Sequence, residues 1–458
     1  MRARPTGEAG PIQHPDLRKF IRHDRFEIPV DRPFAARFFV RNLLIAHSRR
    51  ETIRAAIARA FTAVGLGPSV VFGTKAVARP ERDARVGRLC LLLRDAGAID
   101  DPSPDVITLD DHGYSPRGKL VAFIFERGAA RPGVLAKMCS GPEQGETLRR
   151  EHEALGTVRA RLDEDLRSTV PAPLALVKEG EDTAVAETIL PGSPMYLAMR
   201  NSLVARRNVA GHFRLAREWL VRFQQLTQTG EAAVGSEDWD ELVVRPLTHC
   251  QGGYPASSDE HRLISGILRK AEGLQAARLP IVASHGDYWA GNLLVDGSYL
   301  GIVDWERFSE QGSPFYDLLM FTTSYGLNYP WKFGCYAEPE EAFRTTYAGN
   351  GWMARLVRSH LHAYCDALGL SPQLLEVVLP AFLATRAIEE TAGSGGNAST
   401  GSVREHERAR LSLPAAAPGK ERLWNRLFQE YMRLEGQQTP PAKWASVFDT
   451  TSATRLPR

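Results

Sequence analysis

The sequence predicts an α+β protein in which a strand-rich part precedes a larger, mostly helical part. Four runs have the composition and the bounding turn residues of strands: 119–125, 134–138, 293–295 and 299–303. Three segments after residue 200 carry apolar residues at helical spacing: 212–227, 354–368 and 372–391. A chain of 458 residues with 43% hydrophobic residues is long enough for two lobes, each with its own core.

The residues that indicate chemistry lie in the segment 284–292, which reads Ser-His-Gly-Asp-Tyr-Trp-Ala-Gly-Asn. Asp304-Trp305-Glu306 follows twelve residues after Asn292. Transfer of a γ-phosphoryl group requires a carboxylate beside the acceptor hydroxyl and hard oxygen ligands for Mg²⁺. Asp287 is therefore the candidate catalytic base, and Asn292 and Asp304 are the candidate metal ligands.

A predicted hairpin makes this spacing physically reasonable. Asp296-Gly297 is a strong two-residue turn signal between the runs 293–295 and 299–303. Such a hairpin would return Asp304 close to Asn292. The alternative is that each polar residue has only a local structural role, capping a turn or ending a strand. Because the order and spacing of Asp287, Asn292 and Asp304 agree with the predicted hairpin, we favour the phosphoryl-transfer interpretation.

On these residues the chain resembles the aminoglycoside phosphotransferase and choline kinase-like family of small-molecule kinases. The resemblance is carried by His285-Gly286-Asp287 with Asn292, by 304–306, and by 312–319, which reads Gly-Ser-Pro-Phe-Tyr-Asp-Leu-Leu. It implies that Asp287 is the base, that Asn292 and Asp304 bind Mg²⁺, and that Asp317 is chiefly architectural. Protein kinases proper have Arg in the first triplet and Asp-Phe-Gly at the metal site, so this chain is closer to the small-molecule branch.

The resemblance implies a bilobal protein-kinase-like fold. A small antiparallel β-rich N-lobe with one long helix would be followed by a larger, mostly helical C-lobe, with an N-terminal extension before both. The expected boundaries are a flexible N-terminus (1–33), an α/β extension (34–100), the N-lobe (101–193), the C-lobe with the catalytic loop (194–436) and a tail (437–458). The extension contains helical patterns at 51–64 and 86–98, and its role is open between a cap, a small domain and a partner-binding surface.

A phosphate-binding lysine and a helical glutamate are expected in the N-lobe. Lys137 lies in the run 134–138, where the family has its ATP lysine; a solvated edge residue is the alternative. The following helix is predicted from Glu146 to about residue 165. At about 100° per residue, Glu151 falls on its apolar face and Glu153 points roughly opposite. Glu151 is therefore the candidate partner of Lys137.

The remaining nucleotide contacts follow from the resemblance alone. It places further strands at 170–177 and 183–190, with backbone groups near Glu187 and Ile189 binding the adenine. It also places the phosphate-covering loop at 113–118, where Ser115 would contact phosphate. Pro116 removes an amide donor from this loop, so a plain surface turn explains it equally well. Two supporting residues complete the set: His285, which would brace the loop, and Glu306, which would assist the metal site.

Charge and composition exclude several other classes. A net charge of +3 with arginines spread along the chain does not favour nucleic acid. No window resembles a membrane span, and the N-terminus lacks a hydrophobic signal core, so we expect no membrane partner. Five scattered cysteines without CxxC pairs favour a cytoplasmic location.

The predicted function is an ATP- and Mg²⁺-dependent phosphotransferase, with GTP as the alternative donor. The acceptor would be a hydroxyl of a small molecule such as a sugar, an amino alcohol or an aminoglycoside-like compound. Two alternatives are a kinase-fold nucleotide-binding or scaffold protein without catalysis, and a kinase that acts on protein. The acceptor's identity and the oligomeric state stay open.

Overall fold

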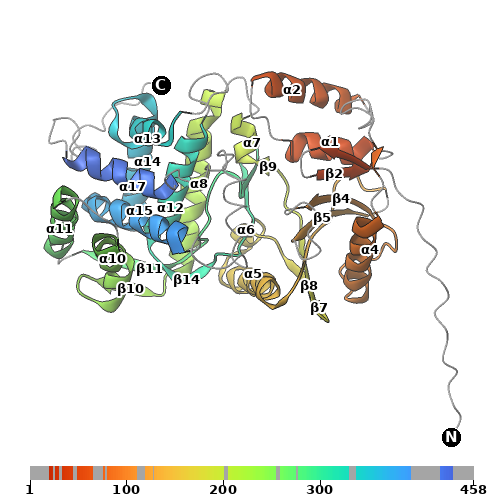
Figure 1. Ribbon diagram of the computed structural model, residues 1–458, viewed down its shortest axis with the longest axis horizontal. Coiled ribbons are helices and arrows are strands. Elements are labelled where there is room, and N and C mark those ends of the chain that lie inside the picture. The colour runs from red at the N-terminus through yellow and green to blue at the C-terminus, as the bar shows by residue number, and fades with distance from the viewer. Residues whose placement is uncertain are drawn as a thin grey trace, which may run out of the picture. The chain divides into compact units, whose positions relative to one another are not determined.

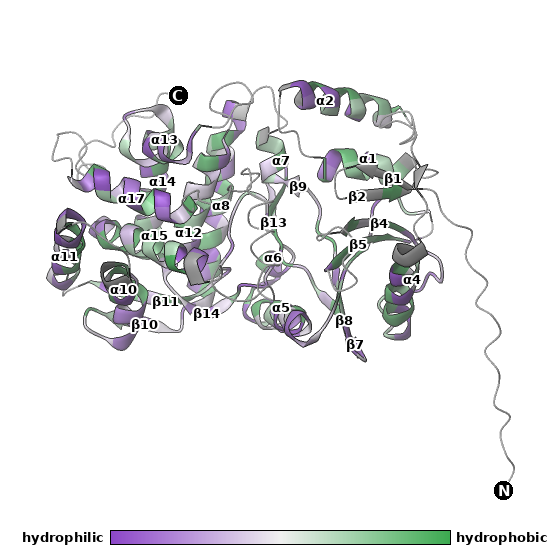
Figure 2. Cartoon of the chain, in the orientation of Figure 1, coloured by the Kyte–Doolittle hydropathy of each residue, from purple (hydrophilic) through white to green (hydrophobic). Residues whose placement is uncertain are grey.

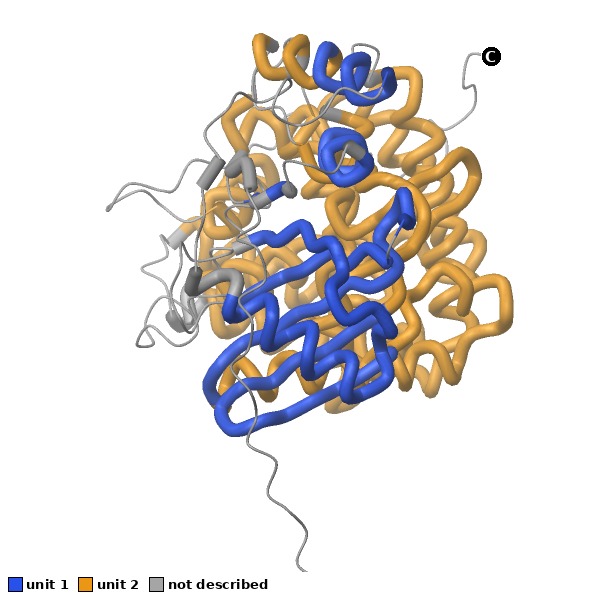
Figure 3. Tube along the Cα trace, turned by 90° about the vertical axis from the view of Figure 1, so that its right-hand side faces the viewer, with its two compact units in different colours: residues 1–41, 57–141, 174–187 blue, residues 42–56, 142–173, 188–458 orange. Residues whose placement is uncertain are grey.

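The computed structural model describes residues 20–23, 26–29, 33–44, 49–64, 76–77, 80–110, 119–126, 128–200, 205–253, 258–274, 277–329, 337–392 and 423–436. The chain divides into two compact units, coloured separately in Figure 3. Unit 1 comprises residues 1–41, 57–141 and 174–187, and unit 2 comprises 42–56, 142–173 and 188–458. Each unit is described below by itself.

Unit 1 is built on one eight-stranded sheet with the strand order β3-β1-β2-β4-β5-β6-β8-β7. The strands are β1 (Phe20–His23), β2 (Phe26–Pro29), β3 (Ala76–Val77), β4 (Asp105–Asp110), β5 (Leu120–Phe125), β6 (Val134–Ser140), β7 (Pro173–Glu179) and β8 (Asp182–Thr188). The pairings from β3 through β6 are antiparallel. Strands from the N-terminal extension therefore continue the sheet that the sequence predicted only from residue 119 onward.

The core of unit 1 lies between this sheet and α4 (Pro80–Asp95). Leu89 and Leu93 of α4 are fully buried and pack in one cluster with Ala122 and Ala136 of the central strands. The strand β5 is entirely apolar and appears green in Figure 2, whereas β4 has three apolar residues between aspartates at its two ends. Burial of both faces of β5 explains its continuous apolar run, which lacks the alternation of a half-exposed strand.

The N-terminal extension also holds α1 (Pro33–Asn42) and α2 (Arg49–Ala63). The helix predicted at 51–64 is present, but the side that it buries is not its stripe of large apolar residues. The small side chains Ala55 and Ala58 are buried with Thr62, whereas the large apolar ones are exposed: Ile53, Ile57, Phe61 and Val64. A further difference is that β1 and β2 lie within the segment 1–33, which was expected to be flexible.

Unit 2 is mostly helical (Figure 1). Its helices include α5 (Pro142–Arg161), α6 (Glu164–Arg167), α7 (Met195–Arg200), α8 (Ala205–Thr227), α9 (Glu237–Trp239), α10 (Arg245–Gly253), α11 (Ser258–Gly273), α12 (Pro314–Asn328), α13 (Pro339–Phe343), α14 (Trp352–Leu368), α15 (Leu375–Ala392) and α17 (Leu423–Gly436). Short π and 3₁₀ turns lie at Asp240–Val244, Arg344–Ala348 and Pro372–Leu374. Two small three-stranded sheets complete the unit: β10 (Gly230–Ala233), β11 (Arg278–Ser284) and β14 (Ser309–Gly312), then β13 (Tyr299–Ile302), β12 (Leu293–Asp296) and β9 (Ser193–Pro194).

The α+β fold class predicted from the sequence is confirmed: an antiparallel sheet forms one unit and a mostly helical bundle forms the other. The long helix expected from residue 146 is α5, which begins four residues earlier at Pro142. Segments 393–422 and 437–458 lie outside the described residues. Within the described part of the chain, every helix is too short or too polar to cross a lipid bilayer.

Candidate active site

The loop that follows β11 is held in a conformation that only glycine permits at its second residue. Gly286 has φ 78°, in the left-handed region. A side chain there would also collide with the carbonyl oxygen of Arg307. Close approach of the 304–307 turn therefore explains the Gly of His-Gly-Asp on physical grounds.

Asp317 of α12 holds the same loop through hydrogen bonds to its backbone. Its two carboxylate oxygens accept hydrogen bonds from the backbone N–H groups of His285 at 2.7 Å and Gly286 at 2.9 Å. Complete burial raises the pKa of Asp317 to about 7, although the two N–H donors act in the opposite direction. The architectural role that the resemblance implied for this residue agrees with these contacts.

Asp287 and Asn292 are in direct contact. The side-chain Nδ2 of Asn292 donates to the Oδ2 of Asp287 at 2.8 Å and to its backbone oxygen at 3.0 Å. Both side chains are buried. Because the amide nitrogen is engaged by Asp287, the Oδ1 of Asn292 lies on the opposite side of the amide, where it can serve as a metal ligand.

The predicted hairpin is present and leads to Asp304. β12 and β13 pair antiparallel from Leu293↔Ile302 to Asp296↔Tyr299. Beyond this ladder, the N–H of Val303 donates to the carbonyl oxygen of Asn292 at 3.0 Å, which places Asp304 beside the loop. Asp304 has φ 72°, the one positive value among described residues other than glycine. Backbone strain of this kind is concentrated at functional sites.

His285 connects the loop to the strand end through both ring nitrogens. Its Nε2 lies 3.1 Å from the carbonyl oxygen of Val303, and its Nδ1 lies 3.2 Å from the backbone nitrogen of Asp287. A neutral ring with its hydrogen on Nε2 satisfies both bonds, because Nδ1 then accepts from the N–H of Asp287. The ring also contacts the indole of Trp305 edge to face, with centroids 4.6 Å apart. These contacts fit the bracing role predicted for His285.

Three carboxylates gather next to this loop. Side-chain oxygens of Glu151, Asp304 and Glu306 lie within 4.8 Å of one another. Glu151 is buried on α5, on the face that the helical rotation predicted. Carboxylate oxygens are hard donors of the type that Mg²⁺ prefers, and the Oδ1 of Asn292 is another such donor, so the residues present fit this ion.

The other residues predicted to bind nucleotide lie elsewhere in the chain. Lys137 is buried in β6 and Glu187 is buried in β8, while Ile189 is partly buried just after that strand. Ser115 and the loop 113–118 lie outside the described residues. Lys137 belongs to unit 1 and Glu151 to unit 2, so their pairing stays a prediction.

An aromatic layer supports the loop, and its partners on α8 were not predicted from the sequence. Trp219 of α8 stacks on Tyr288, and the Tyr288 hydroxyl donates to the carbonyl oxygen of Ala216 at 2.9 Å. Trp305 packs on the same layer and is fully buried. Trp289, the next residue in the loop, is also buried and contacts the ring of Tyr196. The signal was present as aromatic residues inside the motif, but their partners on α8 lie about 70 residues upstream.

Arg307 is a second residue that the sequence analysis missed. Burial lowers the pKa of its guanidinium, but the nearby carboxylates of Glu389, Asp287 and Glu306 and the phenol of Tyr316 raise it, and the net shift is upward. Arg307 is thus a stable cation close to the candidate base. Nothing in its local sequence distinguishes it from the chain's other arginines.

Comparisons with known proteins identify the family of the chain. A search of solved structures gives similarity to aminoglycoside phosphotransferase APH(3'')-Id from Streptomyces rimosus, with 14% identity, 65% of this chain and 98% of that chain covered, and a TM-score of 0.37. It also gives a choline/ethanolamine kinase family protein from Mesorhizobium loti, with 14% identity, coverages of 77% and 99%, and a TM-score of 0.35. Among curated proteins, none matches the chain. The sequence profile of the phosphotransferase enzyme family matches residues 108–359, more than half of the chain. The chain therefore belongs to the phosphotransferase enzyme family.

Proposed function

We propose that this protein transfers the γ-phosphate of ATP to a hydroxyl group of a small molecule, in a reaction that depends on Mg²⁺. The observation that carries the proposal is the contact of Asn292 with Asp287, together with the hairpin that brings Asp304 to the same loop. A candidate base and two candidate metal ligands thereby meet within one short stretch of chain. The family match supports phosphotransfer as the reaction class.

Each residue has a distinct role in the proposed reaction. Asp287 would orient the acceptor hydroxyl and take its proton, and Asn292 fixes the orientation of that carboxylate. Bound Mg²⁺ would neutralise charge on the phosphates, held by Asn292 and Asp304 with Glu306 nearby.

The nucleotide would be bound by residues outside this loop. Lys137 would contact the α- and β-phosphates, and Glu151 would keep that lysine in place. Ser115 and the backbone near Glu187 and Ile189 would complete the nucleotide contacts. The acceptor belongs to the class of sugars, amino alcohols or aminoglycoside-like alcohols, and we expect the protein to act in the cytoplasm.

The direct test is a screen of small alcohols for acceptor-stimulated release of ADP from Mg-ATP. Wild-type protein is expected to release ADP slowly without acceptor and faster with one or more compounds. Asp287→Asn keeps the shape of the side chain and should abolish both rates. Because the variant retains the other nucleotide contacts, Mg-ATP should still raise its melting temperature.

The outcomes separate an enzyme from a binding protein. Stabilisation by Mg-ATP without any ADP release, in wild-type protein and with every acceptor, would show a nucleotide-binding protein without catalysis. Equal ADP release by wild type and Asp287→Asn would assign the activity to another site or to a contaminant.

A further inference from the structure

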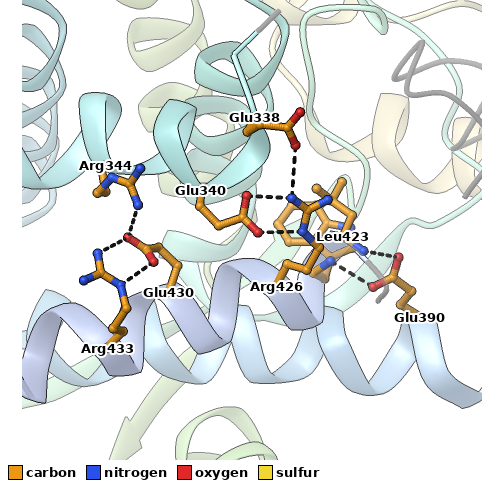
Figure 4. Close-up of polar contacts among 9 residues, drawn as sticks. Glu338, Glu340, Arg344, Glu390, Leu423, Arg426, Glu430 and Arg433 are labelled. Atoms are coloured by element: carbon orange, nitrogen blue, oxygen red, sulfur yellow. Dashed lines mark hydrogen bonds and ion pairs between the residues drawn. The ribbon is translucent and has the colours of Figure 1, made fainter. Parts of the chain in front are cut away.

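The C-terminal helix α17, which lies beyond the family match, is fixed to the rest of unit 2 by charged contacts (Figure 4). The carboxylate of Glu390, at the end of α15, accepts hydrogen bonds from the first backbone N–H groups of α17, Leu423 at 3.0 Å and Trp424 at 2.8 Å. Arg426 forms a two-bonded pair with Glu340 of α13, at 2.6 and 2.7 Å. Such caps and pairs set the position of a helix along its axis.

Trp424, fixed in this way, covers a buried cation. The guanidinium carbon of Arg386 lies 4.8 Å from the centroid of the Trp424 ring. The Arg386 side chain is only 1% exposed, a costly position for a charge that lacks good partners. Its Nη1 donates to the Oε2 of Glu389 at 2.6 Å and to the hydroxyl of Tyr316 at 3.4 Å.

Glu389 joins this buried cation to the candidate active site. Its Oε2, which accepts from Arg386, also accepts from the Nη2 of Arg307 at 3.3 Å. The backbone of Arg307 is packed against Gly286, the residue before Asp287. One carboxylate oxygen therefore ties α15 to the turn that follows Asp304, and that turn lies against the loop of the candidate base.

We propose that Arg386 and Glu389 are positioning residues that hold Arg307, and with it the 304–307 turn, against the loop that carries Asp287. This inference rests on the proposed function and adds residues to it that touch none of the reacting groups. Through Trp424, α17 contributes to the same arrangement. The link from Arg386 through Glu389 to Arg307 accounts for a buried arginine on α15, where an apolar residue of similar volume would cost less to bury.

The test compares two glutamates of matched exposure in the full-length protein. Glu389→Gln, at a side chain that is 38% exposed, removes the charge that joins the two arginines; because buried Arg386 then loses its charged partner, stability is measured beside rate. Glu146→Gln is the matched control, because one oxygen of Glu146, at a side chain that is 39% exposed on α5, also accepts from two arginines, Arg149 and Arg150. Acceptor-independent hydrolysis of Mg-ATP is measured over a range of ATP concentrations, and melting temperatures are recorded for all proteins.

Glu389→Gln is expected to lower kcat about tenfold, with KM for ATP changed less than about twofold, since small misplacements of catalytic groups act on the chemical step. Glu146→Gln should leave both kcat and KM unchanged. Arg386→Lys, which keeps the charge, should retain more activity than Arg386→Met. A merely structural role would lower stability in Glu389→Gln and in both Arg386 variants without this split between kcat and KM.

Wild-type kcat in Glu389→Gln would overturn the proposal, and so would equal losses of kcat in Glu389→Gln and Glu146→Gln. Asp287→Asn is run beside them. If it abolishes hydrolysis while Glu389→Gln has no effect, the positioning role fails and the proposed function stands. If Asp287→Asn hydrolyses ATP normally, both fail.

Discussion

The side-chain amide of Asn292 donates a hydrogen bond of 2.8 Å to the carboxylate of Asp287. In the proposed reaction this bond would give Asn292 two functions, because its nitrogen would orient the candidate base and its oxygen would be available to Mg²⁺. A change at position 292 should therefore affect the chemical step and the Mg²⁺ requirement together.

Asn292→Ala is expected to lower kcat about 10- to 100-fold and to raise the Mg²⁺ concentration needed for half-maximal rate. The measurement is ADP release as a function of Mg²⁺. Asn328→Ala is a suitable control, since Asn328 is also buried and donates to the carbonyl oxygen of Ser324 at 2.9 Å. It should cost about 1 kcal/mol of stability and leave the Mg²⁺ dependence unchanged. An identical Mg²⁺ profile for Asn292→Ala and wild type would contradict the assignment.

Gly286→Ala should be far more damaging than Gly297→Ala. Both glycines have positive φ, 78° and 62°, so alanine costs about 1–2 kcal/mol at either position. At Gly297, the hairpin turn, nothing lies within 4 Å of the added methyl group. At Gly286 the methyl group meets the carbonyl oxygen of Arg307, so the total loss should exceed about 3 kcal/mol. Urea denaturation measures both values, and equal losses would refute the close approach.

Asp304 combines a charge with a positive φ of 72°, and two substitutions separate these properties. Asparagine tolerates the left-handed region, so Asp304→Asn should keep the stability of the protein while greatly raising its Mg²⁺ requirement. Alanine loses the charge and adds strain, so Asp304→Ala should also cost about 1–2 kcal/mol of stability. Activity at graded Mg²⁺ and urea denaturation provide the two readouts. If Asp304→Asn were active at wild-type Mg²⁺ levels, Asp304 would not be a metal ligand.

Burial raises the pKa of Asp317 from 3.8 to about 7, so folded protein holds a proton that unfolded protein releases. The contribution of this group to stability is fully present below about pH 4 and is lost as pH rises to about 7. The loss is on the order of a few kcal/mol. Asp317→Asn should be less stable overall, because the NH₂ group of asparagine cannot accept one of the two backbone N–H bonds that Asp317 accepts. Its stability should also vary less across this pH range, because asparagine does not titrate. The unfolding free energy at several pH values tests this, and parallel curves for the two proteins would exclude the shift.

The predicted pairing of Lys137 with Glu151 can be tested without a structure of the nucleotide complex. Lys137→Met and Glu151→Gln should each reduce the rise in melting temperature that Mg-ATP produces in wild type. If the two residues act as a pair, the double variant should lose little more than either single variant. Additive losses would show that Lys137 and Glu151 act independently.

The sequence predicted those parts of the site that depend on local pattern. The hairpin around Asp296-Gly297 has strong turn chemistry, and the inward orientation of Glu151 follows from helical rotation alone. The face of α2 was not predictable, because an apolar stripe and a stripe of small residues can each form the buried side. The link from Arg307 to Glu389 spans 82 positions and leaves no periodic signal. The positive φ of Asp304 was not predicted either, because aspartate enters the left-handed region more often than most residues but adopts it at few positions.

The rings beneath the loop have a consequence for how the protein responds to heat. Tyr288 and Trp305 belong to the same apolar cluster as the helices of unit 2, so we expect the loop of the candidate base to keep its conformation until that cluster melts. On heating, the hydrogen bonds of this loop should be lost together with the aromatic circular dichroism of unit 2, whereas unit 1, which has its own core, can unfold at another temperature.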